Sequence, residues 1–167
     1  MFEFSRETPA DADAVEWLYD LAFAPGRRAL SSYRLREGVA PVAELCWTAR
    51  DETGTVAGAI RYWPVLIGEP GAAALLLGPV AVHPTRQGEG VGALLIAETL
   101  AAARDAGWAR VILVGDLAYY KRFGFSREAA AGVAFPPPTN PDRVLGRALE
   151  DGAFDGVAGE VRRWPAG

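Results

Sequence analysis

The chain has 167 residues, enough for one domain with a well-buried core, and its composition is half hydrophobic and 23% charged. Its formal net charge of −4 argues against a general nucleic-acid binder, which would carry a basic excess. The single cysteine, Cys46, excludes an intrachain disulfide and a cysteine-based metal cluster, and we expect no bound metal.

The N-terminal segment predicts one strand and two helices. Residues 2–6 alternate in polarity, as a strand does. Thr8 or Asp11 can cap the helix that follows, and residues 25–26, Pro-Gly, would end it. Residues 27–36 predict a second short helix with an arginine-rich outer face. The apolar stripe of the first helix consists of Val15, Leu18, Leu21 and Ala22.

The middle of the chain predicts an antiparallel meander. Strands at about 42–50 and 55–67 are joined by the polar turn Asp51–Gly54. Residues 71–82 form another strand, with Gly78-Pro79 inside it. Because proline cannot donate a hydrogen bond to the ladder, this dipeptide marks a sheet edge or a bulge.

The second half predicts one β-α-β unit and two final strands. A helix at about 90–106 ends at Gly107 and leads to the buried strand "RVILVGD". The stretch "LAYYKRFGF" predicts a short helix and a turn before a strand near Phe125. The last strands lie in "RVLGRALE" and "VAGEVRRW", after the stiff loop "AFPPPTNP". The order of elements predicts an α+β fold in a single domain over residues 1–167.

Neither a signal peptide nor a membrane span is predicted. The N-terminus "MFEFSRE" lacks the basic and apolar regions of a signal peptide. The longest apolar stretch, Ala72–Val82, is too short to cross a bilayer and contains Pro79. We therefore expect a cytoplasmic protein that binds neither membranes nor nucleic acid.

Three glycines at alternate positions, 88, 90 and 92, precede the helix at 90–106. A helix start has backbone N–H groups without intrahelical partners and carries partial positive charge. Glycines leave these amides uncovered and permit positive φ, so a strand, a glycine loop and a helix can together bind a phosphate. A turn that binds nothing is the alternative.

Three kinds of phosphate site are compatible with a glycine loop. A Walker loop requires Gly-Lys-Ser/Thr, which the sequence lacks, because Ala93 and Leu94 follow Gly92. A dinucleotide site is formally satisfied by Gly88, Gly90 and Ala93, with Asp116 as the ribose-binding acid. However, "HPTRQ" separates the strand from the first glycine, and an antiparallel meander precedes the unit.

The stretch "VAVHPTRQGEGVGALL" resembles motif A of the GCN5-related N-acetyltransferases (GNAT), Arg/Gln-x-x-Gly-x-Gly/Ala, on Gln87, Gly90 and Gly92. The later "LAYYKRFGF" resembles the family's Tyr before Gly-Phe, and "VGDLAYYKRFGF" is most similar to the bacterial YhbS-like branch. The resemblance covers nearly the whole chain. It implies the GNAT fold, a mostly antiparallel mixed sheet that is splayed at the cofactor slot and flanked by helices.

The resemblance implies that acetyl-coenzyme A is the cosubstrate. Its pyrophosphate would lie on the loop amides, and its pantetheine arm would pair with the edge of Val80–Val82, beside the bulge at Gly78-Pro79. Arg86 could contact a phosphate or be a solvated loop cation. The implied cosubstrate-binding residues are Val80, Ala81, Val82, Arg86, Gln87, Gly88, Gly90, Val91, Gly92 and Ala93.

The implied reaction is direct transfer of the acetyl group from the thioester to an amine. The amide near Val82 would stabilise the oxyanion, and Tyr120, which aligns with the family tyrosine, would be the general acid. Tyr119 is expected to be a packed aromatic residue. The only histidine, His83, is expected to have a loop role rather than a catalytic one.

The general base is unassigned. Asp116 stands where the family commonly has Asn, and we expect it to cap the helix in "LAYYKR". Glu44 and Glu69 are further candidates, and water can serve. Aromatic candidates for the acceptor pocket, built from the first helices and the loop at 135–140, are Trp17, Tyr19, Tyr33, Trp63 and Phe135. Arg27, Arg28, Arg34 and Arg36 would favour an acidic acceptor or form a solvated helix face.

The resemblance thus predicts acetylation of a small molecule or a protein amine, and a homodimer is compatible with it. One alternative is a noncatalytic acyl-CoA-binding sensor or partner module of the same fold. The weaker alternative is a nucleotide-dependent oxidoreductase, based on Gly88, Gly90, Ala93 and Asp116.

Overall fold

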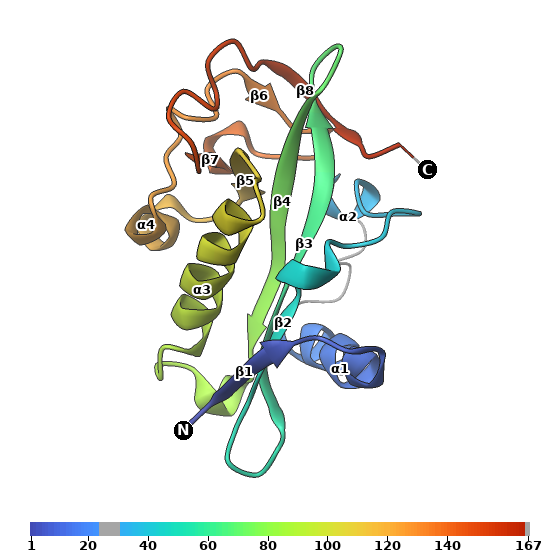
Figure 1. The fold of residues 1–167 in the computed structure, drawn as a ribbon, viewed down its shortest axis with the longest axis vertical. Coiled ribbons are helices and arrows are strands. Elements are labelled where there is room, and N and C mark those ends of the chain that lie inside the picture. The colour runs from blue at the N-terminus through green and yellow to red at the C-terminus, as the bar shows by residue number, and fades with distance from the viewer. Residues whose placement is uncertain (24–30, 166–167) are drawn as a thin grey trace.

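The computed structural model describes residues 1–23 and 31–165 of the chain. Within these residues the strands form an open mixed sheet, mostly antiparallel, in the order β1-β2-β3-β4-β5-β7, flanked by helices (Figure 1). β8 pairs with the far end of β3, and β6 pairs with β8. The strands are β1 Glu3–Arg6, β2 Trp47–Arg50, β3 Val56–Ile67, β4 Ala72–Val82, β5 Arg110–Val114, β6 Val133–Ala134, β7 Val144–Ala148 and β8 Gly159–Arg163. The helices are α1 Ala12–Ala22, α2 Ser31–Arg34, α3 Val91–Asp105 and α4 Leu117–Tyr120.

The long hairpin β3–β4 forms the centre of the sheet (Figure 1). The predicted bulge lies in it: Ile60 pairs with Val80 and Tyr62 pairs with Leu77, so Arg61 stands opposite both Gly78 and Pro79. A bulge bends its strand and accommodates a proline within a sheet. The α+β fold and the bulge are therefore confirmed.

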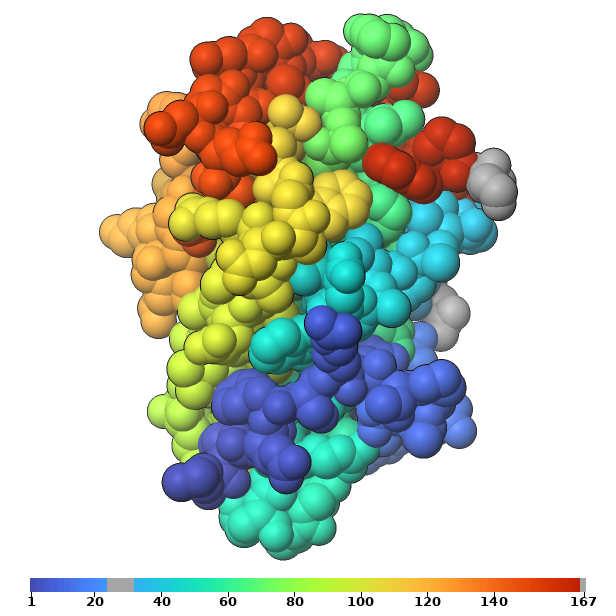
Figure 2. All heavy atoms as spheres, in the orientation of Figure 1, coloured from blue at the N-terminus to red at the C-terminus, as the bar shows by residue number. Residues whose placement is uncertain are grey.

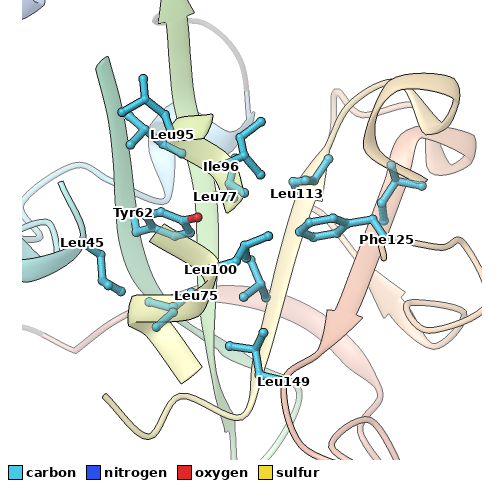
Figure 3. Close-up of a cluster of buried hydrophobic side chains, with 14 of the residues drawn as sticks. Leu45, Tyr62, Leu75, Leu77, Leu95, Ile96, Leu100, Leu113, Phe125 and Leu149 are labelled. Carbon is cyan, nitrogen blue, oxygen red and sulfur yellow. The ribbon is translucent and has the colours of Figure 1, made fainter. Parts of the chain in front are cut away.

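α1 and α3 pack on opposite faces of this hairpin. Neighbouring residues of a strand point to opposite faces. Accordingly, Ile60 lies in the core cluster with Leu95 and Ile96 of α3, whereas Ala59 lies in the cluster with Leu18 of α1. Figure 3 shows the α3 cluster, in which residues of β3, β4 and β5 meet the buried face of the helix. In Figure 2, α3 appears as a yellow band between the N-terminal segments, in blue, and the C-terminal segments, in red.

The glycines at both ends of α3 act as the sequence suggests. Gly90 precedes the helix with φ of +82°, and Gly107 follows it with φ of +92°. The Trp108 N–H donates to the Ala103 carbonyl at 3.1 Å and the Gly107 N–H to Arg104 at 3.0 Å. These two hydrogen bonds close the C-terminal end of α3 and confirm Gly107 as the residue just past the helix.

Several predicted boundaries were wrong. The strand expected at 42–50 begins only at Trp47, because residues 43–45 form a 3-10 turn closed by Leu45 N–H to the Val42 carbonyl, 2.9 Å. Near Phe125 the chain makes one isolated bridge, Ser126 to Gly146, rather than a strand, and β6 was not predicted.

The stripe predicted for α1 was also partly wrong. Val15 and Leu18 are buried, but Leu21 is 44% exposed because it projects from another side of the helix, and Ala22 is exposed at the helix end. Tyr19, which was not predicted to be in the stripe, is fully buried. The expected stop at 25–26 and the first residues of the predicted 27–36 helix, with Arg27 and Arg28, lie outside the described residues; α2 covers 31–34. In residues 1–23 and 31–165, no helix is long and apolar enough to cross a membrane.

Candidate active site

The glycine loop lies between the end of β4 and the start of α3. Gly88 has φ of +87° and Gly90 has φ of +82°, and an added Cβ at either glycine would meet nothing within 4 Å. These positions therefore need glycine for backbone conformation, which side-chain-bearing residues rarely adopt. The first amides of α3 lie directly behind this exposed loop and have no intrahelical acceptors.

Gly92 is needed for close packing instead. It is buried, and an added Cβ would lie 3.3 Å from Val82 Cγ2 and 3.4 Å from the Tyr119 hydroxyl. The glycine thus brings the end of β4, the start of α3 and α4 together. A groove runs along this junction and brings together all ten residues predicted to bind the cosubstrate. Its described lining is Val80, Ala81, Val82, Arg86, Gln87, Gly88, Gly90, Val91, Gly92, Ala93, Tyr119, Tyr120 and Arg122.

The sheet is splayed beside the groove. β4 and β5 pair in parallel only at Leu75–Val111 and Leu76–Ile112, after which β5 pairs with β7 alone among the described strands. The bulge at Pro79 turns the end of β4 away from β5. The Tyr19 hydroxyl of α1 donates a hydrogen bond to the Pro79 carbonyl at 3.0 Å. No described strand pairs with the outer edge of Val80–Val82. This edge is therefore open to an extended ligand.

Tyr120 lies at the inner end of the groove, in α4. Its ring packs against Tyr119 at 5.0 Å and Phe125 at 5.9 Å between ring centroids. An added Cβ at Gly115 would lie 2.7 Å from Tyr120 Cε2, so this glycine leaves the space that the ring occupies. Burial, together with the neighbouring Tyr119, raises the pKa of Tyr120 to about 12. The hydroxyl is therefore a hydrogen-bond donor throughout the neutral range.

Tyr119 lines the groove as well as packing against the core. Its hydroxyl lies next to Gly92, and the Arg122 guanidinium stacks 4.7 Å from its ring centroid. Burial raises the pKa of Tyr119, whereas Arg122 lowers it by a smaller amount. The expectation of a merely packed aromatic was incomplete, because Tyr119 also lines the groove.

Arg86 is not the solvated cation considered above. Its side chain is only 23% exposed, its Nη2 donates to both carboxylate oxygens of Glu52 at 2.9 and 3.1 Å, and its Nε lies 3.6 Å from Glu89. The guanidinium also stacks 4.9 Å from the Phe2 ring centroid. Arg86 thus connects the glycine loop to the β2–β3 turn and the N-terminus while it lines the groove.

His83 and Asp116 have local structural contacts. The His83 Nδ1 bonds to the Thr85 N–H at 3.2 Å and lies 2.8 Å from its hydroxyl, which closes the turn before the glycine loop. Asp116 accepts from the Ala118 N–H at 3.1 Å and so caps α4, as expected. Glu44 and Glu69 are exposed and line neither the groove nor the adjoining cavity.

A second cavity meets the groove at Val80 and Tyr120, which line both. Of the aromatic residues proposed for an acceptor pocket, Tyr33 lines it. Tyr19 and Phe135 are buried in the core, Trp17 is 56% exposed beside His83, and Trp63 lines a neighbouring cavity. These four therefore do not line this cavity. Helical and strand periodicity do not say which aromatic side chains face a cavity.

Sequence reasoning also missed residues that the fold brings to the site. Arg122 lies in the groove and was signalled only by the "YYKR" stretch. Gly115 and the Tyr19 hydroxyl support Tyr120 and the bulge through contacts that no local motif indicates. Among the described residues, no group of three or more His, Cys, Asp or Glu side chains could hold a metal ion.

The splayed sheet, the glycine loop at a helix start and the tyrosine beside them form the arrangement that the GNAT fold implies. The model of the acetyltransferase (GNAT) domain matches residues 43–127, and the chain belongs to this family. This stretch includes the central hairpin, the glycine loop, α3 and α4.

The uncharacterized N-acetyltransferase YhbS of Escherichia coli K12 is 30% identical over 155 residues, which cover 93% of this chain and 92% of that protein. The crystal structure of E. coli YhbS in complex with CoA matches with a TM-score of 0.84 and 28% identity, over 98% of this chain and 89% of that one. A GNAT family acetyltransferase from Brucella melitensis in complex with acetyl-CoA matches with a TM-score of 0.75 and 31% identity, over 99% and 97%. The predicted YhbS-like resemblance is confirmed.

Proposed function

We propose that this protein transfers an acetyl group from acetyl-CoA to a primary amine. The observation that carries the proposal is the junction at Tyr120, where the groove containing the glycine loop meets a second cavity. One opening suits an extended anionic cosubstrate and the other suits an acceptor. The relatives from E. coli and B. melitensis were solved with CoA and with acetyl-CoA, which supports this choice of cosubstrate.

In the proposed complex, the amides of Gly88 to Ala93 bind the pyrophosphate at the positive end of α3. Arg122 lies in the same groove and adds a cation to it. The open edge of Val80–Val82 hydrogen-bonds the pantetheine arm, as an added strand would. The groove therefore directs the thioester toward Tyr120.

The proposed reaction is a direct substitution at the thioester carbonyl. The amine nitrogen forms a bond to the carbonyl carbon, water accepts the amine proton, and the carbon–sulfur bond breaks to release a thiolate. The backbone amide near Val82 stabilises the oxyanion, and the Tyr120 hydroxyl donates a hydrogen bond to the departing sulfur. Because the Tyr120 pKa is raised to about 12, we assign it hydrogen bonding more than full proton transfer.

We further propose that residues 1–167 act as one domain in the cytoplasm, and that the protein is a monomer or a homodimer. A noncatalytic acyl-CoA-binding module remains the alternative, which would use the groove without depending on Tyr120. The dinucleotide alternative would require Asp116 to bind a ribose while one of its carboxylate oxygens caps α4.

Calorimetric titration with acetyl-CoA, with NADH as the control ligand, tests the proposal. We expect one-site binding of acetyl-CoA and none of NADH. Gly90→Glu should abolish binding by placing a negative side chain in the loop. Gly156→Glu is the matched control, because that glycine also has positive φ, +72°, and open space around it, but lies outside the groove. Binding of NADH alone, or equal effects of the two variants, would refute the proposed site.

A further inference from the structure

The cavity beyond Tyr120 has properties that select among amines. Its volume is about 160 Å³, which suits a small acceptor. Because it shares Val80 and Tyr120 with the groove, an acceptor in it would lie next to the thioester in the proposed complex. Its described lining is Phe23, Ser32, Tyr33, Arg36, Leu76, Leu77, Gly78, Pro79, Val80, Val114 and Tyr120.

The charge of this lining is unusual for a site that receives an amine. Arg36 is the one formally charged side chain among the described lining residues, and none of them is a carboxylate. An acceptor whose only charge is an ammonium would be placed beside a guanidinium in a partly enclosed cavity, where like charges repel strongly. An acceptor that also carries an anionic group would instead form an ion pair there.

Local structure directs Arg36 toward the cavity. Leu35, which is 4% exposed, anchors the segment in the core, and the Arg36 N–H donates to the Tyr33 carbonyl at 3.0 Å. The Arg36 guanidinium lies 5.2 Å from the Tyr33 ring centroid. Its Nη2 lies 3.8 Å from the position that a Cβ at Gly78 would occupy, so the end of the side chain lies over the bulge of β4.

We infer that the acceptor is a small primary amine that carries a carboxylate, and that Arg36 binds this carboxylate. A planar guanidinium can bind a carboxylate through two parallel hydrogen bonds, which fixes orientation as well as charge. Leu76, Leu77 and Val114 give the rest of the cavity an apolar wall, which suits an amino acid with an apolar side chain. This inference rests on the proposed acetyl transfer and adds the class of the acceptor.

Matched amines test the inference. We would compare leucine, leucinamide and 3-methylbutylamine, and then phenylalanine, phenylalaninamide and 2-phenylethylamine, as acceptors of acetyl-CoA. We expect kcat/KM to be at least tenfold higher for each free amino acid than for its amide. The amide has the less basic amine, so ordinary amine protonation would favour it, and a preference for the acid must come from the carboxylate.

Substitution of Arg36 separates binding of the carboxylate from a general structural role. Arg36→Met should raise KM for the amino acids at least tenfold, leave kcat within about twofold, and lower KM for the monoamines, because the repelling guanidinium is removed. Arg36→Lys should restore part of the loss. Arg34→Met is the matched control, because Arg34 is an exposed arginine on α2 that does not line the cavity.

A binding measurement gives an outcome that does not depend on turnover. We would titrate the protein, saturated with CoA, with N-acetylleucine and with N-(3-methylbutyl)acetamide. Binding of N-acetylleucine alone, lost in Arg36→Met, supports the inference. Equal binding of both compounds, no binding of N-acetylleucine, or a preference for the amino acid amides in the kinetic series would overturn it. Failure of the proposed function is distinguishable, because it would appear as no binding of acetyl-CoA to the unaltered protein.

Discussion

Replacing Tyr120 with Phe removes one hydroxyl and leaves the packed ring in place. No described residue forms a hydrogen bond with this hydroxyl, so its loss leaves no protein group unsatisfied and stability should not change. Transfer of its proton, at a pKa of about 12, to a thiolate whose conjugate acid has a pKa of about 8.5 is uphill by about 5 kcal/mol. The hydroxyl therefore acts mainly through a hydrogen bond to a charged sulfur, which contributes about 1.5–3 kcal/mol.

We therefore expect Tyr120→Phe to lower kcat by about 10- to 100-fold, since 1.4 kcal/mol corresponds to a factor of ten, and to leave the Kd of CoA within about twofold. Release of the CoA thiol can be followed with a thiol reagent, because the only cysteine, Cys46, is buried. Because burial raises the pKa of Tyr120 from 10 to about 12, the hydroxyl stays protonated up to pH 9, and the loss should be equal at pH 7 and pH 9.

Tyr62→Phe is the control for this prediction. Tyr62 is fully buried in the core cluster under α3, does not line the groove, and its hydroxyl lies 2.8 Å from Thr99 Oγ1. This variant should lose about 1 kcal/mol of stability with little change in kcat. An unchanged kcat in Tyr120→Phe, or a loss that appears only in the Kd of CoA, would refute the role assigned to Tyr120.

Three further substitutions test how the site is supported. Gly115→Ala should cost about 1–3 kcal/mol of stability and lower kcat, because the added methyl group displaces the Tyr120 ring. In a Tyr120→Phe background the same substitution should lower kcat little further. Fully additive losses of kcat would contradict an effect that acts through Tyr120. Gly90→Ala should cost about 1–2 kcal/mol in urea unfolding, because its φ is +82°, and unchanged stability would show that the loop relaxes. Glu52→Gln removes the carboxylate paired with Arg86 and so leaves more positive charge in the groove. CoA should therefore bind more tightly at low salt. Weaker binding would mean that the ion pair positions the loop.

The groove with the glycine loop could be predicted because its signals are contiguous. Positive φ at Gly88 and Gly90 and the start of α3 depend on a few neighbouring residues, and the structure places α3 within about one residue of the predicted helix. The Gly78-Pro79 dipeptide predicted either a sheet edge or a bulge in β4, and the structure has the bulge. These features needed no knowledge of which segments pack together.

The second cavity could not be predicted, because it is made by contacts between distant segments. Tyr19 supports the Pro79 carbonyl across 60 residues of sequence, and Arg36 lies over Gly78 from a segment that precedes the whole sheet centre. A helical period identified Val15 and Leu18 as core residues, but it could not show that Tyr19 is buried while Leu21 is exposed. Which arginine faces the cavity depends on where Leu35 is anchored, which only the assembled core determines.

The bulge of β4 affects both the groove and the second cavity. It turns Val80–Val82 away from β5, which leaves the edge of that segment unpaired among the described strands, and the same turn places Gly78 under the Arg36 guanidinium. Glycine at 78 has φ of +120° and carries no side chain, so it satisfies the backbone geometry and leaves the cavity open at one position. A single irregularity in the central hairpin therefore shapes both the groove and the second cavity. If the proposed acceptor site is correct, a substitution at Arg36 would change acceptor preference and leave the groove lining intact.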